Sequence, residues 1–522
     1  MLSLFRRWDS RSTNTSSNTA LKTNIEEESS GRSFISSISE DALVVIFDFI
    51  FTESCAKYDS EIFPRHPPAL SILKLSHVDE RFRLISLSYP HLWTHISATE
   101  RRPEMGLVNA CLERSRDLPL TVHLTVYLSS SHDPFSDDVL SATKKCAHRW
   151  RSVHVHFLRI HCTPTSSSGM FVDPMRGLKE MRDISAPALN QLRLMNTAWI
   201  MDEEHLFLGS WNVPALRSLA TVHNFPSELL SFQELTSLDM RFSVRSADFF
   251  NFLAFVQASQ LPNLTDLGIA FDHHDQVWTR DVLPTFQRTP LPNVARLRIS
   301  TLISALYDTY RNRLEKNMLR ALSFPNVNEL NVTFEGETLR GGIPDPLFYL
   351  FDAAERIFGR GNDTNGISDG QFPRVSRLQI NISASGLNPH ELAGGVASLL
   401  LPLHIFPSLK ELYVRSNMSP DFGTYYFGGR KQPALRYIEF DVACSAGAST
   451  EASSPSFESE HWKWLRALAD TLFAQGIWHE LEESTLVERV FEDNTDGNSI
   501  RVWDAKSVLS RDMSSRFGLT RT

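Results

Sequence analysis

An apolar triplet recurs along the chain after residue 185, and this repetition limits the folds that the chain can adopt. In each copy, three aliphatic or similar residues have the spacing L-x-x-L-x-L, usually starting two residues after a proline. A unit repeated every few tens of residues is typical of chains that stack supersecondary units into an elongated array. The triplets begin at Leu189, Leu216, Leu235, Leu264, Val294, Val327, Val375, Leu409 and Leu435.

Each triplet predicts one short strand with its apolar residues facing a core and the residues between them facing outward. Such a strand cannot bury its own apolar face without a stacked neighbour. Residues 247–260 and 346–358 have helical periodicity, and residues 359–371, rich in Gly, Asn and Asp, predict a loop. We therefore expect an α/β fold in which residues 185–445 form an irregular solenoid.

The N-terminal residues predict a small all-α bundle instead. Residues 1–33 are rich in Ser, Thr, Asn and Glu, which is typical of a disordered tail. Ser39 is a candidate N-cap for a first helix with one apolar face, and residues 52–68, which include three prolines, predict a loop after it. A second amphipathic helix is expected to contain Leu70, Leu73, Val78, Phe82 and Ile85.

The C-terminal residues, 446–522, predict a linker and a capping element for the last repeat. Residues 460–475 read as a helix, and two apolar runs on either side of residues 494–498 read as a hairpin. The same residues could instead form a separate element. Residues 98–184, between the bundle and the first triplet, are expected to hold a connecting region and atypical first repeats.

Composition and charge exclude several classes of function. The 42% hydrophobic fraction allows a large core, and a net charge of -9 does not favour nucleic acid as a partner. The five cysteines are widely spaced, the N-terminus has no apolar run of signal-peptide length, and no stretch suits a membrane span. We expect a cytoplasmic or nuclear protein without a membrane anchor.

Four segments of the N-terminal part resemble the F-box, in particular its fungal F-box-like branch with a long loop between the first two helices. These segments are residues 38–47 (ISEDALVVIF), 75–78 (LSHV), 87–93 (LSYPHLW) and 113–120 (ERSRDLPL). The resemblance extends over residues 34 to 120, with the F-box-like domain itself at residues 34–97. The downstream triplets are similar to the leucine-rich repeats that often follow this box.

The resemblance implies a non-enzymatic adaptor that docks on the Skp-type adaptor of a cullin-based SCF ubiquitin ligase and selects a protein substrate through its repeats. Ser39 and residues 79–82 depart from the family pattern. A second interpretation is therefore a leucine-rich-repeat scaffold whose degenerate box does not bind a ligase. We expect the ligase adaptor to contact Ile38, Leu43, Ile46, Phe47, Phe82 and Trp93, unless these side chains pack on one another or on the first repeats.

The sequence contains no phosphate loop with Gly-Lys-Ser/Thr, no H-E-x-x-H and no G-x-S-x-G motif. Residues 271–275 (FDHHD) and the pair His154 and His156 could hold a metal, but a solvated loop or surface explains each of them better. Residues 362–370 have the composition of a calcium loop but lack its spacing and its closing glutamate. The basic run at residues 144–151 has one aromatic residue, which favours a solvated helix end over a nucleic-acid site. We therefore expect that the protein is not an enzyme and that it binds no metal and no cofactor.

The outward positions of the predicted strands are the expected substrate site. In several repeats these positions hold arginines, and Arg296 and Arg298 lie two residues apart, so both point to one face. Planar guanidinium donors could read a phosphorylated or acidic segment, whereas a surface of balancing ion pairs is the alternative. The candidate substrate-binding residues are Arg241, Arg296, Arg298, Arg377, Tyr413 and Arg415.

Overall fold

The computed structural model places most of the predicted strands and helices. It describes residues 38–60, 67–99, 105–128, 135–159, 182–196, 210–222, 233–242, 252–253, 256, 261–271, 288–304, 321–337, 354, 357–358, 372–385, 396–399, 401–423, 427, 430–445, 459–491 and 498–517. The tail at residues 1–33, the histidines at residues 273–274, the loop at residues 359–371 and most of the two helices predicted between repeats lie outside these residues.

Most of the described strands belong to one mixed α/β fold with a large sheet of fourteen strands. Neighbouring strands pair in parallel throughout, and only the last pair, β17 with β18, is antiparallel. In spatial order they are β1 (His95–Thr99), β2 (Leu120–Leu128), β3 (Trp150–Arg159), β4 (Gln191–Asn196), β5 (Ser218–Val222), β6 (Ser237–Phe242), β7 (Asp266–Phe271), β9 (Arg296–Ser304), β11 (Glu329–Glu337), β12 (Arg377–Ser385), β14 (Glu411–Ser416), β16 (Tyr437–Ser445), β17 (Glu483–Phe491) and β18 (Asn498–Asp504).

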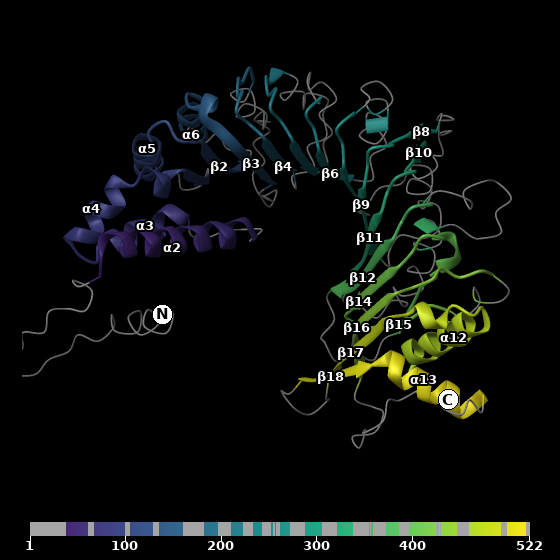
Figure 1. The fold of residues 1–522 in the computed structure, drawn as a ribbon. Helices are drawn as coiled ribbons and strands as arrows, with labels where there is room; N and C mark the ends of the chain where they lie inside the picture. Colours follow the sequence, from purple (N-terminus) through teal and green to yellow (C-terminus); the bar gives the residue numbers. More distant parts are fainter. Residues whose placement is uncertain are drawn as a thin grey trace, which may run out of the picture.

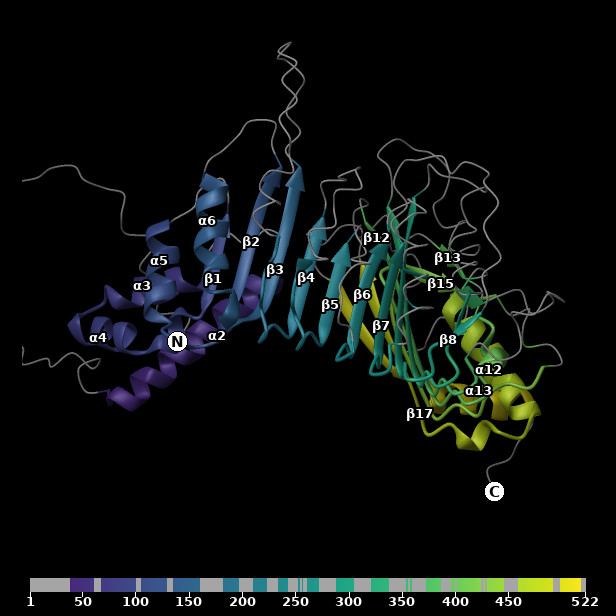
Figure 2. The ribbon, with the colours of Figure 1, turned by 90° about the horizontal axis from the view of Figure 1, so that it is seen from above.

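The sheet bends into an arc, with its strands side by side along the inner side of the curve (Figure 1). Helices α5 (Met105–Arg114), α6 (Phe135–Lys144), α12 (Glu460–Ala474) and α13 (Ala505–Phe517) lie on the outer side. Figure 2 shows the same succession of strands from above. Two short parallel pairs, β8 (Thr289–Pro290) with β10 (Leu322–Ser323) and β13 (Val396–Ser398) with β15 (Ser419–Asp421), are separate from the main sheet.

All nine triplets fall on strands of this sheet, which confirms the strand predicted from each. In every repeat the strand starts two residues after the first apolar residue, as in Val327 and β11. The apolar residues of that triplet, Val327, Leu330 and Val332, are fully buried, and the residues between them are exposed or half-buried. Alternation of this kind gives the sheet one core face and one face turned toward the hollow of the arc.

The turns before the strands stack in register as well. Phe324, Phe372 and Phe406 each stand three residues before a triplet, and their rings stack with centroids 6.3 and 6.0 Å apart. Beside them, Asn326 donates from Nδ2 to the carbonyl of Pro292 at 2.7 Å, and Asn293 donates to Pro262 at 2.6 Å. These bonds satisfy backbone oxygens at the turns and tie each repeat to the one before it.

The sheet begins earlier than the triplets indicate. Strand β1 starts at His95, inside the residues assigned to the bundle, and β2 and β3 lie within the expected connecting region at residues 98–184. At the other end, β17 pairs in parallel with β16, so the C-terminal element continues the sheet. The predicted helix at residues 460–475 and the predicted hairpin are confirmed as α12 and as β17 with β18.

The N-terminal bundle differs from expectation in two helices. Helix α2 (Glu40–Ser60) continues through most of the predicted loop at residues 52–68, and Ser39 Oγ accepts its N-terminal bond from Ala42 N at 3.2 Å, as predicted. The predicted second helix is two separate helices in the structure. The second of them starts after Asp79, whose side chain caps it by accepting a bond from Phe82 N at 2.8 Å. They are α3 (Pro68–Ser76) and α4 (Glu80–Ser88), followed by the 3-10 turn η2 (Pro90–Trp93).

None of the helices in the described part of the chain is both long enough and apolar enough to cross a membrane.

Candidate interaction surfaces

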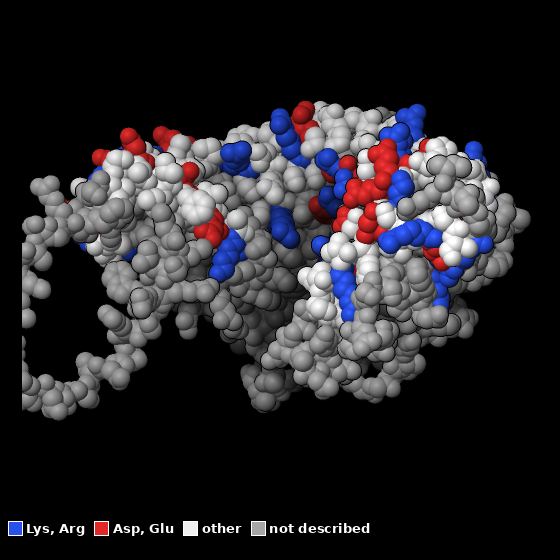
Figure 3. Space-filling view, turned by 60° about the horizontal axis from the view of Figure 1, so that its bottom comes forward, with Lys and Arg blue, Asp and Glu red and all other residues white. Residues whose placement is uncertain are grey.

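The side of the sheet that lines the hollow carries the predicted substrate-binding residues. Figure 3 looks toward this hollow and shows basic and acidic side chains crowded over its strands. The pairing register sets the residues in rows, so Asp266, Arg296, Glu329, Arg377 and Glu411 stand side by side on five neighbouring strands. We refer to this side of the sheet as the inner face.

Arg296 and Arg298 are both engaged by carboxylates of earlier strands. Arg296 donates from Nε and Nη2 to the two oxygens of Asp266, a bond that raises the pKa of the arginine. Arg298 Nη2 donates to both oxygens of Asp239, at 2.7 and 2.9 Å, across the intervening strand β7. The strand has Gly268 at the crossing, where a Cβ atom would lie 1.7 Å from Asp239 Oδ1.

The later arginines of the inner face have partners too. Arg377 Nε lies 3.7 Å from Glu411 Oε2. The guanidinium group of Arg377 also stacks over the Tyr413 ring, with its carbon 4.6 Å from the ring centroid. Arg415 lies 3.2 Å from Asp441, which also accepts a bond from Arg489. The arrangement is that of a surface of balancing ion pairs, the alternative interpretation of these residues.

The structure therefore brings five of the predicted residues onto one face with their donors occupied. Arg241 lies on the same face. It pairs in register with Ala270 of β7, which in turn pairs with Ser300 of β9. The Arg298–Asp239 and Arg377–Glu411 pairs are a third or more exposed and contribute little, about 0–1 kcal/mol each, so a ligand could replace them at low cost. Arg296 and Arg415 pair with carboxylates that are largely buried, Asp266 and Asp441. Recognition of a substrate by these six residues remains a prediction.

Four residues expected to contact a ligase adaptor form the core of the helical bundle instead. Leu43 and Phe47 are at most 1% exposed, Phe82 is 8% exposed and Trp93 is fully buried. Phe47 and Phe82 pack with ring centroids 5.5 Å apart, and Trp93 Nε1 donates to the carbonyl of Ser86 at 2.7 Å. Packing on one another is the alternative interpretation of these side chains, although Phe47 also lines the groove described below, so contact with a ligase adaptor remains a prediction. Ile38 and Ile46 are half-buried.

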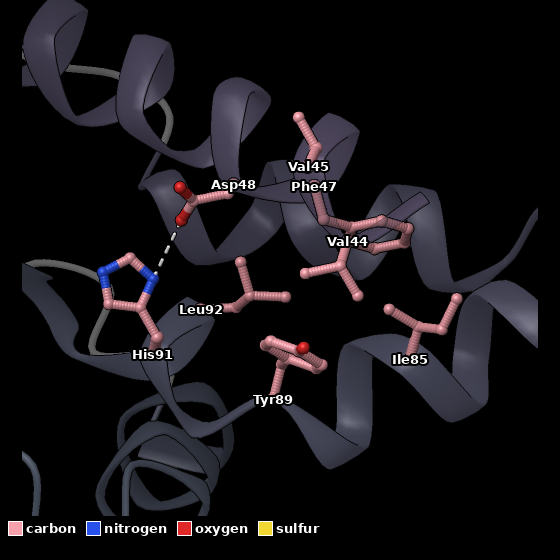
Figure 4. Close-up of a pocket in the computed structure, with 8 residues that line it drawn as sticks. All are labelled: Val44, Val45, Phe47, Asp48, Ile85, Tyr89, His91 and Leu92. Carbon is pink, nitrogen blue, oxygen red and sulfur yellow. Dashed lines mark ion pairs between the residues drawn. The ribbon is translucent and has the colours of Figure 1, made fainter. Parts of the chain in front are cut away.

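A groove opens between α2 and the segment formed by α4 and η2 (Figure 4). It encloses about 420 Å³, and its wall is mostly apolar, with Asp48 and His91 in ion-pair contact at 3.0 Å on one side. Phe47, Ile85 and Leu92 form buried parts of the wall. The lining residues are Val44, Val45, Phe47, Asp48, Ile85, Tyr89, His91 and Leu92.

Large apolar side chains are exposed on the same helices. Val45 and Phe49, one helical turn apart on α2, are each 67% exposed, and Tyr89 lies across the groove at 41%. Leu84 and Leu87 are exposed on α4. Neighbouring exposed apolar side chains in a folded protein mark a contact site more often than isolated ones do. We call Val45, Phe49 and Tyr89, with the groove, the bundle surface.

A buried polar cluster that the sequence did not predict lies at the C-terminal end of the sheet. Glu488 of β17 accepts bonds from Trp462 Nε1 at 3.1 Å, Trp503 Nε1 at 2.7 Å and His461 Nε2 at 2.9 Å. Burial raises the pKa of Glu488, but the bonds from His461 and the two indoles outweigh this effect and hold the pKa below its ordinary value. The charged carboxylate thereby joins α12 to both strands of the hairpin.

Cys444 lies beside this cluster, and its sulfur with one ligand atom each of His461 and Glu488 lies within 4.8 Å. Cysteine, histidine and glutamate are zinc ligands, so in the described part of the chain this is the group whose donor set could hold a metal ion. Both oxygens of Glu488 already accept N–H donors, however, and burial raises the pKa of the Cys444 thiol to about 12. The contacts fit a structural network better than a metal centre.

His154 and His156 share the inner face, as their spacing predicts, and take part in no metal-binding group of the described residues. His154 packs on His123 with ring centroids 4.1 Å apart, and His123 stacks on His95 at 4.5 Å. Tyr58, near the end of α2, closes this row with its ring 5.1 Å from His123. Burial, followed by the neighbouring imidazoles, lowers the pKa of His123, so His123 packs as a neutral ring between Tyr58 of the bundle and the first strands of the sheet.

No protein-family model matches the chain, and no curated protein matches its sequence.

Proposed function

We propose that this protein is the substrate-recognition adaptor of an SCF-type ubiquitin ligase, with the bundle surface docking on the Skp-type adaptor and the inner face binding the target protein. The observation that supports docking best is the exposure of Val45 and Phe49 beside an open apolar groove. The bundle has already buried its own core around Phe47 and Trp93. The remaining apolar area gains free energy only if a partner covers it.

A helix is the partner element that such a surface suits. Val45 and Phe49 are four residues apart on α2, so their side chains are adjacent, and Tyr89 stands on the opposite wall of the groove. An amphipathic helix can lay its apolar face into a groove of this kind. The resemblance of the bundle to the F-box implies that the Skp-type adaptor supplies this helix.

The rest of the chain is consistent with a leucine-rich-repeat solenoid that presents a target. Parallel strands at successive repeats, buried triplets and stacked turns are what such an array requires. Its inner face is a continuous row of polar side chains, outside the contacts that hold the core. A surface of this kind can be varied without loss of the fold, which suits substrate selection.

The test is binding of the full chain to a purified Skp-type adaptor, measured by calorimetry. Phe49→Ala should weaken binding by about 1–3 kcal/mol if Phe49 is a central anchor, and Phe49→Glu should abolish it, because a charge would be buried at the interface. Ile500→Glu is the matched control, since Ile500 is also 67% exposed but lies on β18, at the far end of the sheet. That variant should bind like the wild type.

Two outcomes would contradict the proposal. A folded wild-type chain that does not bind the Skp-type adaptor would favour the second candidate, a repeat scaffold whose box has lost the ligase. Equal binding by wild type and Phe49→Glu would show that docking uses another surface. Phe47→Ala is unsuitable as a probe, because truncating this buried ring costs about 3–5 kcal/mol of folding stability and would disturb the bundle itself.

A further inference from the structure

The inner face changes in charge along the arc. On strands β4 to β9, the basic side chains of this face are those of Arg193, Arg241, Arg296 and Arg298, and the carboxylates are those of Asp239 and Asp266. On β11, β12, β14, β16 and β17 the carboxylates outnumber the guanidinium groups. The carboxylates there are those of Glu329, Glu335, Glu411, Glu439, Asp441 and Glu483, and the guanidinium groups are those of Arg377, Arg415 and Arg489. We call this part the late inner face.

Each of the three arginines of the late inner face is in an ion pair, whereas some of its carboxylates are not. Asp441 takes both Arg415 and Arg489, and Glu411 faces Arg377. Within the described residues, no basic nitrogen comes within 4.0 Å of Glu329, Glu439 or Glu483. All three side chains are exposed. Glu329 lies between Arg296 and Arg377 in the pairing register and interacts electrostatically with Arg296, whereas no basic residue stands directly opposite Glu439 or Glu483.

An exposed aromatic ring stands among these carboxylates. Tyr437 is 36% exposed, and the pairing register places it between Glu411 on one neighbouring strand and Glu483 on the other, each roughly 5 Å away along the sheet. Glu439 is two residues further along β16, roughly 7 Å from Tyr437 and on the same face. The Tyr437 hydroxyl donates to Glu482, which fixes the ring.

We propose that the late inner face binds an extended lysine- or arginine-rich segment of the target protein, with Tyr437 and the carboxylates of Glu439 and Glu483 at its centre. This inference rests on the proposed function, because it names the class of substrate that the adaptor would select. It is an alternative to the prediction of a phosphorylated or acidic segment, which would first have to displace Asp266, Asp239 and Glu411 from the arginines.

Charge complementarity identifies the occupant. A cationic side chain over the Tyr437 ring would gain a cation–π contact and two carboxylate neighbours at once. The adjacent strands already show this arrangement within the protein, where Arg377 lies over Tyr413 and beside Glu411. Lysines or arginines at alternate positions of an extended segment repeat about every 7 Å, which matches the distance from Tyr437 to Glu439 along the strand.

The experiment uses the full chain and fluorescence anisotropy with two labelled peptides, one alternating lysine with glycine and one alternating glutamate with glycine. The lysine peptide should bind and the glutamate peptide should not, and added salt should weaken binding because the contacts are exposed. Glu439→Lys with Glu483→Lys should weaken binding of the lysine peptide by at least about tenfold. Glu439→Gln with Glu483→Gln, a smaller change, should weaken it in the same direction and serves if the reversed pair does not fold.

The control changes net charge equally at another place. Glu113→Lys with Asp117→Lys alters two exposed residues, one on α5 at the outer side of the arc and one in the turn after this helix, and should leave binding within about twofold of wild type. Equal losses in both pairs, no binding of the lysine peptide, or preference for the glutamate peptide would overturn the proposal.

Docking on the Skp-type adaptor is measured on the same variants, because the bundle surface and the late inner face lie at opposite ends of the arc. A chain that docks but does not discriminate between the peptides would overturn this inference alone. A chain that discriminates between them but does not dock would overturn the proposed ligase function alone.

Discussion

Replacing the buried carboxylate of Glu488 tests whether one charged group holds the C-terminal cap on the sheet. The carboxylate accepts three N–H donors, from two indoles and one imidazole, that come from α12 and β18. In Glu488→Gln, one oxygen remains as an acceptor, but the amide nitrogen replaces the other and faces a donor. A hydrogen bond to a charged group contributes about 1.5–3 kcal/mol and a neutral one about 0.5–1.5 kcal/mol.

The loss of one charged bond and the weakening of the others predict a destabilisation of about 2–4 kcal/mol at pH 7. The dependence on pH follows from the lowered pKa of Glu488. A carboxyl whose folded-state pKa is below its unfolded value stabilises the fold above the unfolded pKa, and this stabilisation is lost as the pH falls through the folded pKa. The difference between wild type and Glu488→Gln should therefore shrink in acid.

Hydrogen exchange followed by mass spectrometry gives the local free energy of opening for α12, β17 and β18, since the cap can open without the whole arc. Glu482→Gln is the matched control, because it removes an exposed carboxylate from the same region and should cost less than about 1 kcal/mol. The reasoning fails if Glu488→Gln opens no more readily than Glu482→Gln at pH 7, or if its effect is equally large in acid.

Two further changes test other parts of the fold. Gly268→Ala should force the half-exposed Asp239–Arg298 pair apart. The free energy of unfolding in urea should nevertheless change by less than about 1 kcal/mol, because the pair contributes little and glycine is unfavourable in a strand. A loss above about 2 kcal/mol would contradict this. Burial raises the pKa of the Cys111 thiol to about 12, so peptide mapping at pH 8 should find it alkylated by iodoacetamide only after unfolding, and rapid labelling of the native chain would contradict the burial.

The strands could be predicted because the signal for them is local. A triplet such as the one at Val327 contains its own burial pattern, and the same pattern in the neighbouring repeat makes stacking the one way to cover it. The length of α2 was missed because residues 52–60 mix charged and small side chains. Phe51 and Tyr58 are seven residues apart, two helical turns, and both are 5% exposed, so their spacing was a signal for the longer helix.

The contact surface of the bundle could not be separated from its core by sequence. Helix α2 has apolar residues on more than one side, with Leu43 and Phe47 buried and Val45 and Phe49 exposed. Each pair has the same spacing of four residues, so periodicity alone finds two apolar stripes and cannot rank them. The packing of α3, α4 and η2 decides between them, and it depends on a helix break at Asp79 that the apolar pattern does not show.

The ion-pair partners of the predicted arginines follow from the pairing register of the strands and could not be predicted from the sequence. Arg298 and its partner Asp239 are 59 residues apart in sequence, and they meet only because the repeat between them places Gly268 under the contact. The lengths of the insertions between triplets vary, so no fixed sequence spacing marks such pairs. The charge that remains after the pairs are formed is the charge a partner meets without breaking a pair, and on the late inner face it is negative at Glu439 and Glu483. These two carboxylates can meet a cationic ligand without breaking an ion pair, whereas an anionic ligand would first have to displace a carboxylate from an arginine, so the surface favours a positively charged ligand.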